Sequence, residues 1–118
     1  MIRHIVMWRL SGDTPHERQE ARRLVKECFE GLRGRIPGML KLEVGLDTSE
    51  VDYACDVVLF TEFESQDALD AYATHPEHLR VRERLGNIRT ARFQVDYHLE
   101  VKADSATQEK TAANSRVG

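Results

Sequence analysis

The chain of 118 residues has little cysteine, little excess charge of either sign and no long apolar run, and each shortage excludes a class of protein. Cys28 and Cys55 belong to no CxxC motif, so we expect two buried, reduced thiols rather than a disulfide-stabilised scaffold. A net charge of −3 argues against nucleic acid or an anionic membrane as the main partner. No apolar run is long enough for a bilayer, and the first residues lack the layout of a signal peptide. We therefore expect a single globular domain in the cytoplasm.

Apolar residues alternate in four stretches and recur at helical spacing in two, in an order that predicts an α+β fold. We predict a first helix over residues 15–33, with Gly34 as its C-cap, and a second that begins after Ser65. The predicted strands cover residues 2–10, 40–46, 54–63 and 90–99. The order β-α-β-β-α-β is the ferredoxin-like plan, in which a four-stranded antiparallel sheet carries two helices on one face.

The strands over residues 2–10 and 54–63 are apolar on both faces at their centres. Since the helices cover only one face, the open sheet face needs another cover. A second copy of the chain is the simplest one and would give a homodimer of the dimeric α+β barrel type, although an added peptide would serve as well. In the strand over residues 90–99, one face is polar, and we expect that face to be the less covered one.

The composition changes near residue 101, after which no large apolar residue could anchor a helix or strand. We assign residues 1–100 to the folded domain. Residues 101–118 are predicted to be a polar, flexible tail, and a weak surface helix is the open alternative.

Residues 72–78 gather a tyrosine, two histidines and one of only three prolines where a long helix would otherwise continue. Pro76 disfavours helical backbone at His75 and suits the first position of a new helix, so the helix should stop and restart here. Tyr72 and His78 would point in different directions on an unbroken helix, and the break can turn both towards one cavity. For His75 we expect a capping role rather than catalysis. For Tyr72, a core position with its hydroxyl bound to the backbone is an open alternative.

Several short motifs, taken together and in this order, are similar to those of the stress-responsive dimeric A/B barrel (Dabb) domain family. The stretches that carry the resemblance are Ile2-Arg3-His4-Ile5-Val6, Ile36-Pro37-Gly38-Met39, Phe63-Glu64-Ser65, Tyr72-Ala73-Thr74-His75-Pro76-Glu77-His78 and Val95-Asp96-Tyr97. The resemblance implies a homodimeric α+β barrel with a pocket in each subunit, between the sheet and the helices. Some family members also hold a cation on main-chain carbonyls near the turn that corresponds to residues 33–39.

Within this family the chain resembles a plant polyketide cyclase, which closes a ring by aldol condensation without a metal or an organic cofactor. Tyr72 and His78 match the acid–base pair of that cyclase, and His4 and His75 match histidines of its pocket. The resemblance thus implies cofactor-free chemistry by a neutral histidine as base and a tyrosine hydroxyl as donor. For His4, the role of a core histidine satisfied by hydrogen bonds is an open alternative.

The chain departs from that cyclase on the first helix, where Val25 and Lys26 replace aromatic side chains and only Phe29 keeps the aromatic character. We expect a small hydrophobic carbonyl compound as ligand, Tyr72 and His78 as the catalytic residues, and neither metal nor organic cofactor. The further pocket residues that we expect are His4, Val6, Trp8, Val25, Phe29, Leu59 and His75. Two other functions stay open, namely a non-catalytic, stress-related binding protein and a monooxygenase of the dimeric α+β barrel type.

Overall fold

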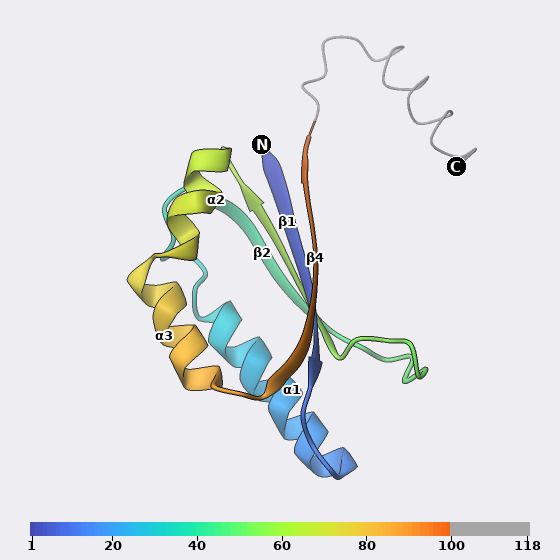
Figure 1. The fold of residues 1–118 in the computed structure, drawn as a ribbon. Helices are drawn as coiled ribbons and strands as arrows, with labels where there is room; N and C mark the ends of the chain where they lie inside the picture. Colours follow the sequence, from blue (N-terminus) through green and yellow to red (C-terminus); the bar gives the residue numbers. More distant parts are fainter. Residues whose placement is uncertain (100–118) are drawn as a thin grey trace, which may run out of the picture.

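A computed structural model describes residues 1–99, so the tail predicted over residues 101–118 lies outside the described part of the chain. The elements in order are β1 (Ile2–Leu10), α1 (Pro15–Glu30), β2 (Met39–Leu46), β3 (Val57–Phe63), α2 (Gln66–Ala73), α3 (Pro76–Leu85) and β4 (Arg89–His98). They form one antiparallel sheet in the order β2-β3-β1-β4, with the helices gathered on one side of it (Figure 1). This is the predicted ferredoxin-like fold, in which the second helical segment is divided into α2 and α3.

Side chains at the helix starts show why the helices begin where they do. Thr14 Oγ1 accepts a hydrogen bond from the Glu17 N–H at 3.1 Å, and Ser65 caps α2 in the same way. The first N–H groups of a helix have no partner within it, and such caps supply one. His75 caps α3, because its Nδ1 accepts a hydrogen bond from the Glu77 N–H at 3.1 Å. The capping role predicted for His75 is confirmed.

Helix α1 is shorter than predicted and does not reach Gly34. It ends at Glu30, and Gly31 is its C-cap. The reason is the burial that follows, since Leu32 and Ile36 are 2% and 6% exposed and the chain must bend at once to place both in the core. Gly34 lies in that turn with a φ of 79°, a conformation in which glycine has no steric penalty.

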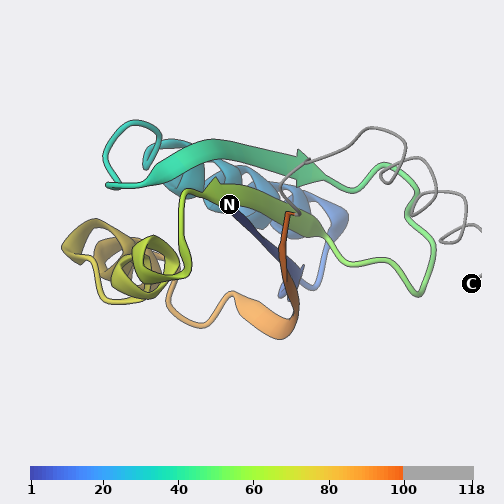
Figure 2. The ribbon, with the colours of Figure 1, turned by 90° about the horizontal axis from the view of Figure 1, so that it is seen from above.

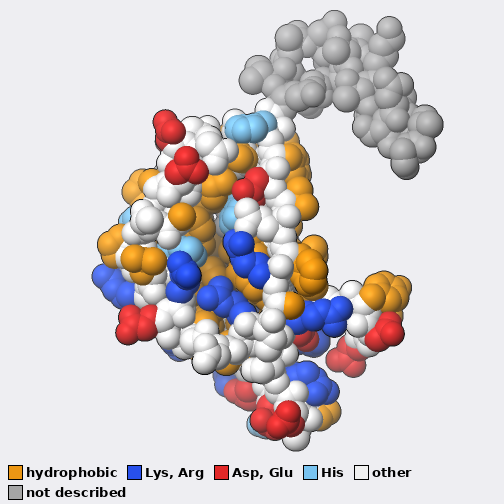
Figure 3. Space-filling view, in the orientation of Figure 1, with side chains coloured by type: hydrophobic (Ala, Val, Ile, Leu, Met, Phe, Trp, Pro, Cys, Tyr) orange, Lys and Arg blue, Asp and Glu red, His pale blue; other side chains and the backbone are white. Residues whose placement is uncertain are grey.

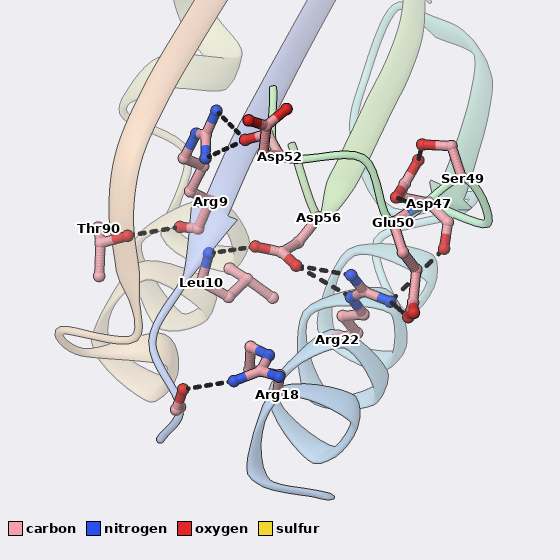
Figure 4. A network of polar contacts seen from close by, with 11 residues as sticks. Arg9, Leu10, Arg18, Arg22, Asp47, Ser49, Glu50, Asp52, Asp56 and Thr90 are labelled. Atoms are coloured by element: carbon pink, nitrogen blue, oxygen red, sulfur yellow. Dashed lines mark hydrogen bonds and ion pairs between the residues drawn. The ribbon is translucent and has the colours of Figure 1, made fainter. Parts of the chain in front are cut away.

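The strand predicted from residue 54 begins only after Asp56, because the Asp56 side chain clamps the preceding loop to β1 and α1 by hydrogen bonds. Its carboxylate accepts hydrogen bonds from the Leu10 N–H and from Arg22 Nη2, each at 2.7 Å (Figure 4). The clamp joins the end of β1 to α1. Cys55 lies in the same loop and is therefore only partly buried, contrary to the prediction that both thiols are buried.

The hydrophobic core lies between the helices and one face of the sheet. Alternate residues of β1 and β3, from Ile2 to Leu10 and from Val57 to Phe63, are buried there. The opposite face carries no helix of residues 1–99, and Phe93 and Val95 of β4 are 50% and 56% exposed on it. The single chain therefore has an open, apolar sheet face.

Strand β4 turns its polar face towards the helices, which is the reverse of what the sequence led us to expect. Its Arg92 and Asp96 lie opposite Trp8 and His4, two residues of β1 on the helix side. β4 is an edge strand, and Figure 2 shows it at the end of the sheet away from β2. Because α2 packs on β1 and β3 instead, the polar side chains of β4 border an open cleft rather than a packed core.

Candidate functional site

A cleft lies between β4 on one side and α2 and α3 on the other (Figure 3). It is made of two adjoining cavities with volumes of about 500 and 280 Å³, which share Ala73, His78 and Arg92. The volume of the larger cavity lies in the range that is usual for small-molecule sites in proteins. Histidine and arginine side chains line the cleft, and Trp8 forms part of its floor. The cleft is the natural place to examine the predicted site residues.

Tyr72 forms the buried wall of the cleft on α2. Its side chain is 3% exposed and packs against Phe63, with 5.2 Å between the ring centroids. Its hydroxyl is buried and has no hydrogen-bond partner among residues 1–99, so the alternative of a hydroxyl bound to the backbone is wrong. Burial raises the pKa of Tyr72 well above its ordinary value of 10.0. The residue therefore keeps its proton at neutral pH and can donate it in a hydrogen bond to a ligand.

His78 lies in the first turn of α3 and borders both cavities of the cleft. Its Nδ1 is 3.2 Å from the carbonyl oxygen of Ala73. A carbonyl only accepts, so this hydrogen bond places the proton on Nδ1 and leaves a lone pair on Nε2. Burial is the main reason that the pKa of His78 lies below its ordinary value of 6.5, and the positive charges of Arg82 and Arg89 lower it further. The neutral imidazole is thus the stable form at neutral pH.

The break between helices α2 and α3, just before Pro76, brings Tyr72 and His78 together. Their ring centroids are 4.3 Å apart and the ring planes form an angle of 32°. The two rings stack rather than share a hydrogen bond, because the tyrosine hydroxyl has no partner among the described residues. The hydroxyl is thus unpartnered but covered, and a ligand in the cleft meets it only when the side chains that cover it move.

His4 approaches the same cleft from the sheet. Its ring is in edge contact with Tyr72, with 6.4 Å between centroids. His4 Nδ1 and Asp96 Oδ1 are 2.6 Å apart, and Gln94 Nε2 donates to the other carboxylate oxygen at 2.9 Å. A carboxylate that is held on both oxygens fixes the orientation of the imidazole, and Asp96 was not among the predicted residues. The alternation of β4 and its position beside β1 are the signals that could have identified it.

The other predicted pocket residues divide between the cleft and the core. Trp8 borders the cleft, and Phe29 stacks behind it with 5.0 Å between ring centroids and an angle of 18°. Four apolar residues expected in the pocket line neither cavity of the cleft and are at most 1% exposed, namely Val6, Val25, Phe29 and Leu59. Phe29 can influence a ligand only through Trp8. His75 lines neither cavity and serves as the cap of α3.

Three arginines of the cleft were missed by the sequence reasoning. Arg82 of α3 and Arg89 and Arg92 of β4 line the larger cavity. The guanidinium carbon of Arg89 lies 5.2 Å from the ring centroid of Trp8. Arg82 follows His78 by one helical turn, and Arg92 shares a strand face with Asp96. Helical and strand periodicity could therefore have placed Arg82 beside His78 and Arg92 beside Asp96.

No three His, Cys, Asp or Glu side chains within residues 1–99 form a group that could hold a metal ion. Within the same range, every helix is too short or too polar to cross a membrane.

Comparisons with known proteins support the fold and a family. The family model described as the stress responsive A/B barrel domain (Dabb) matches residues 2–99. A dimeric protein of unknown function with a ferredoxin-like fold from Bacteroides fragilis is 33% identical, with a TM-score of 0.74, over 83% of this chain and 95% of that one. A Dabb family protein with a ferredoxin-like fold from Mesorhizobium loti is 25% identical, with a TM-score of 0.66, over 85% of this chain and 97% of that one.

A third solved structure shares the fold alone. The hydroxynitrile lyase from Passiflora edulis is 15% identical, with a TM-score of 0.69, over 87% of this chain and 96% of that one. A comparison with curated proteins found no match. The comparisons therefore show the family and the fold, and they assign no reaction or ligand to the cleft.

Proposed function

Because the chain belongs to the stress-responsive A/B barrel (Dabb) domain family, we propose that its cleft binds a small hydrophobic carbonyl compound. We propose further that Tyr72 and His78 act on this compound by cofactor-free acid–base chemistry, as in the plant polyketide cyclase that the sequence resembles. One observation supports this most strongly: an unpartnered, buried hydroxyl lies beside a neutral imidazole at an open cleft. Membership of the family alone does not fix a reaction.

The two side chains can divide the chemistry of enolate formation between them. His78 Nε2 takes a proton from the carbon next to a carbonyl, and the Tyr72 O–H donates to the oxygen on which negative charge develops. In a ring closure the enolate carbon then bonds to a second carbonyl carbon of the same molecule. The proton held by His78 goes to the oxygen of that second carbonyl. The product has the same atoms as the substrate, so the reaction needs no oxidant, reductant or cofactor.

His4 has a supporting place in this scheme. Its Nδ1 is bound to Asp96, which leaves its Nε2 for a ligand in the cleft that both His4 and Tyr72 line. From the sheet floor it can bind a second oxygen of the ligand, opposite the helix wall. We propose that His4 positions the ligand, while the proton transfer belongs to His78.

The enolate step can be tested without knowing the natural substrate. Acetophenone exchanges its methyl protons slowly in D₂O, and NMR spectroscopy follows the exchange directly. We expect the wild-type protein to accelerate the exchange and His78→Gln to reduce that acceleration by about 100-fold, the usual contribution of a general base. His16→Gln, a change at an exposed histidine of α1, is the matched control and should leave the rate unchanged.

The same assay separates catalysis from the non-catalytic alternative. If acetophenone binds to the wild-type protein and no acceleration of exchange is detected, the cleft is a binding site without chemistry. Equal rates in wild type and His78→Gln would also refute the role of His78.

We also propose that the chain forms a homodimer through its open sheet face. Phe93, Val95 and Tyr97 of β4 expose apolar surface there, and Met7 of β1 adds to it. Arg3, a cation at one end of this face, already pairs with Glu62 at 3.2 Å, so burial of Arg3 would not leave its charge unpaired. The similar protein from Bacteroides fragilis is described as dimeric. A second copy of the sheet is the partner with matching shape and polarity.

A further inference from the structure

Three arginines gather at the α3 and β4 end of the cleft without a partner of opposite charge. Arg82, Arg89 and Arg92 line the same cavity, and none of them forms an ion pair within residues 1–99. Two neighbours on α3 behave differently, because Arg80 pairs with Glu77 and Arg84 lies 3.8 Å from Glu27. The arginines without an ion pair are therefore those that line the cleft, whereas these two arginines of α3 outside the cleft are paired.

The carboxylates that line the cleft are bound to other groups. Asp96 is held by His4 and Gln94, and Asp70 Oδ1 accepts a hydrogen bond from Gln66 Nε2 at 2.9 Å. They line the smaller cavity, beside α2, whereas Arg82 and Arg89 line only the larger cavity and Arg92 borders both. A chain with a net charge of −3 thus keeps one strongly positive region inside a recess.

The arrangement of these arginines has an electrostatic cost that the described residues do not compensate. Burial lowers the pKa of Arg89, and repulsion from Arg82 and Arg92 lowers it further. Arg89 also lies over the face of Trp8, which restricts its guanidinium group to the cleft. Like charges held together in a recess are stabilised when an anion binds between them.

We infer that this end of the cleft binds the carboxylate of an organic acid. An arginine guanidinium matches a carboxylate by two parallel N–H···O bonds, and a second arginine can bind the remaining lone pairs. From that anchor, the apolar part of the ligand extends past Ala73, which borders both cavities, towards Tyr72 and His78. This inference rests on the proposed function for the carbonyl group and names the substrate class as an oxo acid.

The inference has a direct test in a pair of matched probes. 4-Acetylbenzoate and 4-acetylbenzamide share the ring and the ketone, and only the first carries a charge. Isothermal titration calorimetry should show that the wild-type protein binds the acid at least tenfold more tightly than the amide. Arg92→Gln and Arg89→Gln should remove this preference, whereas Arg84→Gln, a change on α3 outside the cleft, should preserve it.

Two outcomes would overturn the inference. One is equal affinity of the wild-type protein for the acid and the amide. The other is a preference for the acid that survives in both Arg92→Gln and Arg89→Gln. Arg92 is exposed on an edge strand, so its replacement leaves the core unchanged, and circular dichroism confirms folding of each variant.

The binding test is independent of catalysis. Tyr72→Phe should keep the preference for 4-acetylbenzoate over 4-acetylbenzamide, because both probes carry the same ketone and the carboxylate contacts lie on α3 and β4. If the acid binds selectively and exchange at its methyl group is not accelerated, the anion site stands and the proposed chemistry fails. If exchange of acetophenone is accelerated and the acid has no advantage in binding, the chemistry stands and the anion site fails.

Discussion

Tyr72 and His78 lie with their rings in contact, and burial shifts their pKa values in opposite directions. Burial holds the proton on the tyrosine and disfavours the charged form of the histidine, so both residues are neutral at pH 7. A neutral donor beside a neutral acceptor is the combination that enolate formation requires. The titratable and charged groups that line the cleft with this pair are His4 of β1, Asp70 of α2, Arg82 of α3, and Arg89, Arg92 and Asp96 of β4.

The pH dependence of exchange follows from the lowered pKa of His78. Protonation removes the base, so the rate of acetophenone exchange should fall towards low pH with a midpoint below 6.5, the ordinary pKa of histidine. On the alkaline side, the rate should show no loss near pH 10, because burial keeps the proton on Tyr72. A pH–rate profile measured by NMR gives both limits. A midpoint above 6.5 would mean that the charged form of His78 is favoured, contrary to its environment.

The same shift has a consequence for stability. The unfolded chain binds a proton at His78 more readily than the folded protein does, because the folded pKa is the lower one. The contribution of neutral His78 to the free energy of unfolding is thus fully present above pH 6.5. It decreases as the pH falls from 6.5 through the folded pKa.

His75 shows how a single residue at the break between α2 and α3 positions the site. Its Nδ1 caps α3, whose first turn carries His78. His75→Ala should lower the free energy of unfolding by about 1 kcal/mol, the usual cost of losing an N-cap, as measured by urea denaturation. His75→Asn is the matched variant, because asparagine is among the best N-cap residues and should restore most of the stability. Equal stability of the wild type and the alanine variant would contradict the capping role.

The strands and helices were largely predictable from local patterns, whereas the site was only partly so. Alternation and capping motifs depend on neighbours in sequence, and they identified the helix starts at Pro15 and Pro76. Alternation also showed that β4 has two faces, but it could not show which one turns to the helices. That depends on the pairing of His4 with Asp96 across two strands that lie far apart in sequence. The cluster of Arg82 with Arg89 and Arg92 was missed for the same reason.

The pocket residues predicted on α1 illustrate a second limit of prediction from a single sequence. Val25 and Phe29 were expected in a pocket because the sequence resembles that of a plant polyketide cyclase, whose first helix lines its pocket. The structure places both in the core, because α1 packs closely over the sheet while the cleft opens beside α2 and α3. Which helix leaves room for a ligand depends on packing between whole elements, and a single sequence does not contain that information in a local pattern.

The sheet as a whole links the site to the proposed dimer. One face carries the core and the cleft, and the other exposes apolar residues of β1 and β4, including Met7 and Val95. A dimer that covers this face would immobilise β4, which forms one wall of the cleft. At the scale of the whole molecule, we therefore predict that dimer formation holds the β4 wall of the cleft in place.

A charge on the open face should prevent assembly. Val95→Asp puts a carboxylate at the centre of the face, where pairing would bury it without a partner, so we expect a monomer. Analytical ultracentrifugation at several protein concentrations measures the change. Leu79→Asp is the matched control, because Leu79 is 44% exposed on α3, away from this face. A wild-type protein that sediments as a monomer at all concentrations would contradict the proposed dimer.

The role of Tyr72 is the most direct test of the chemistry proposed for the cleft, because its hydroxyl is the group that the fold leaves without a partner. Exchange of the acetophenone methyl protons and binding of acetophenone should be measured side by side in the wild type and in Tyr72→Phe. We predict that the affinity changes by no more than about twofold, while the exchange rate falls by about 100-fold, the usual cost of losing one oxyanion donor. An unchanged exchange rate in Tyr72→Phe would contradict the proposed function.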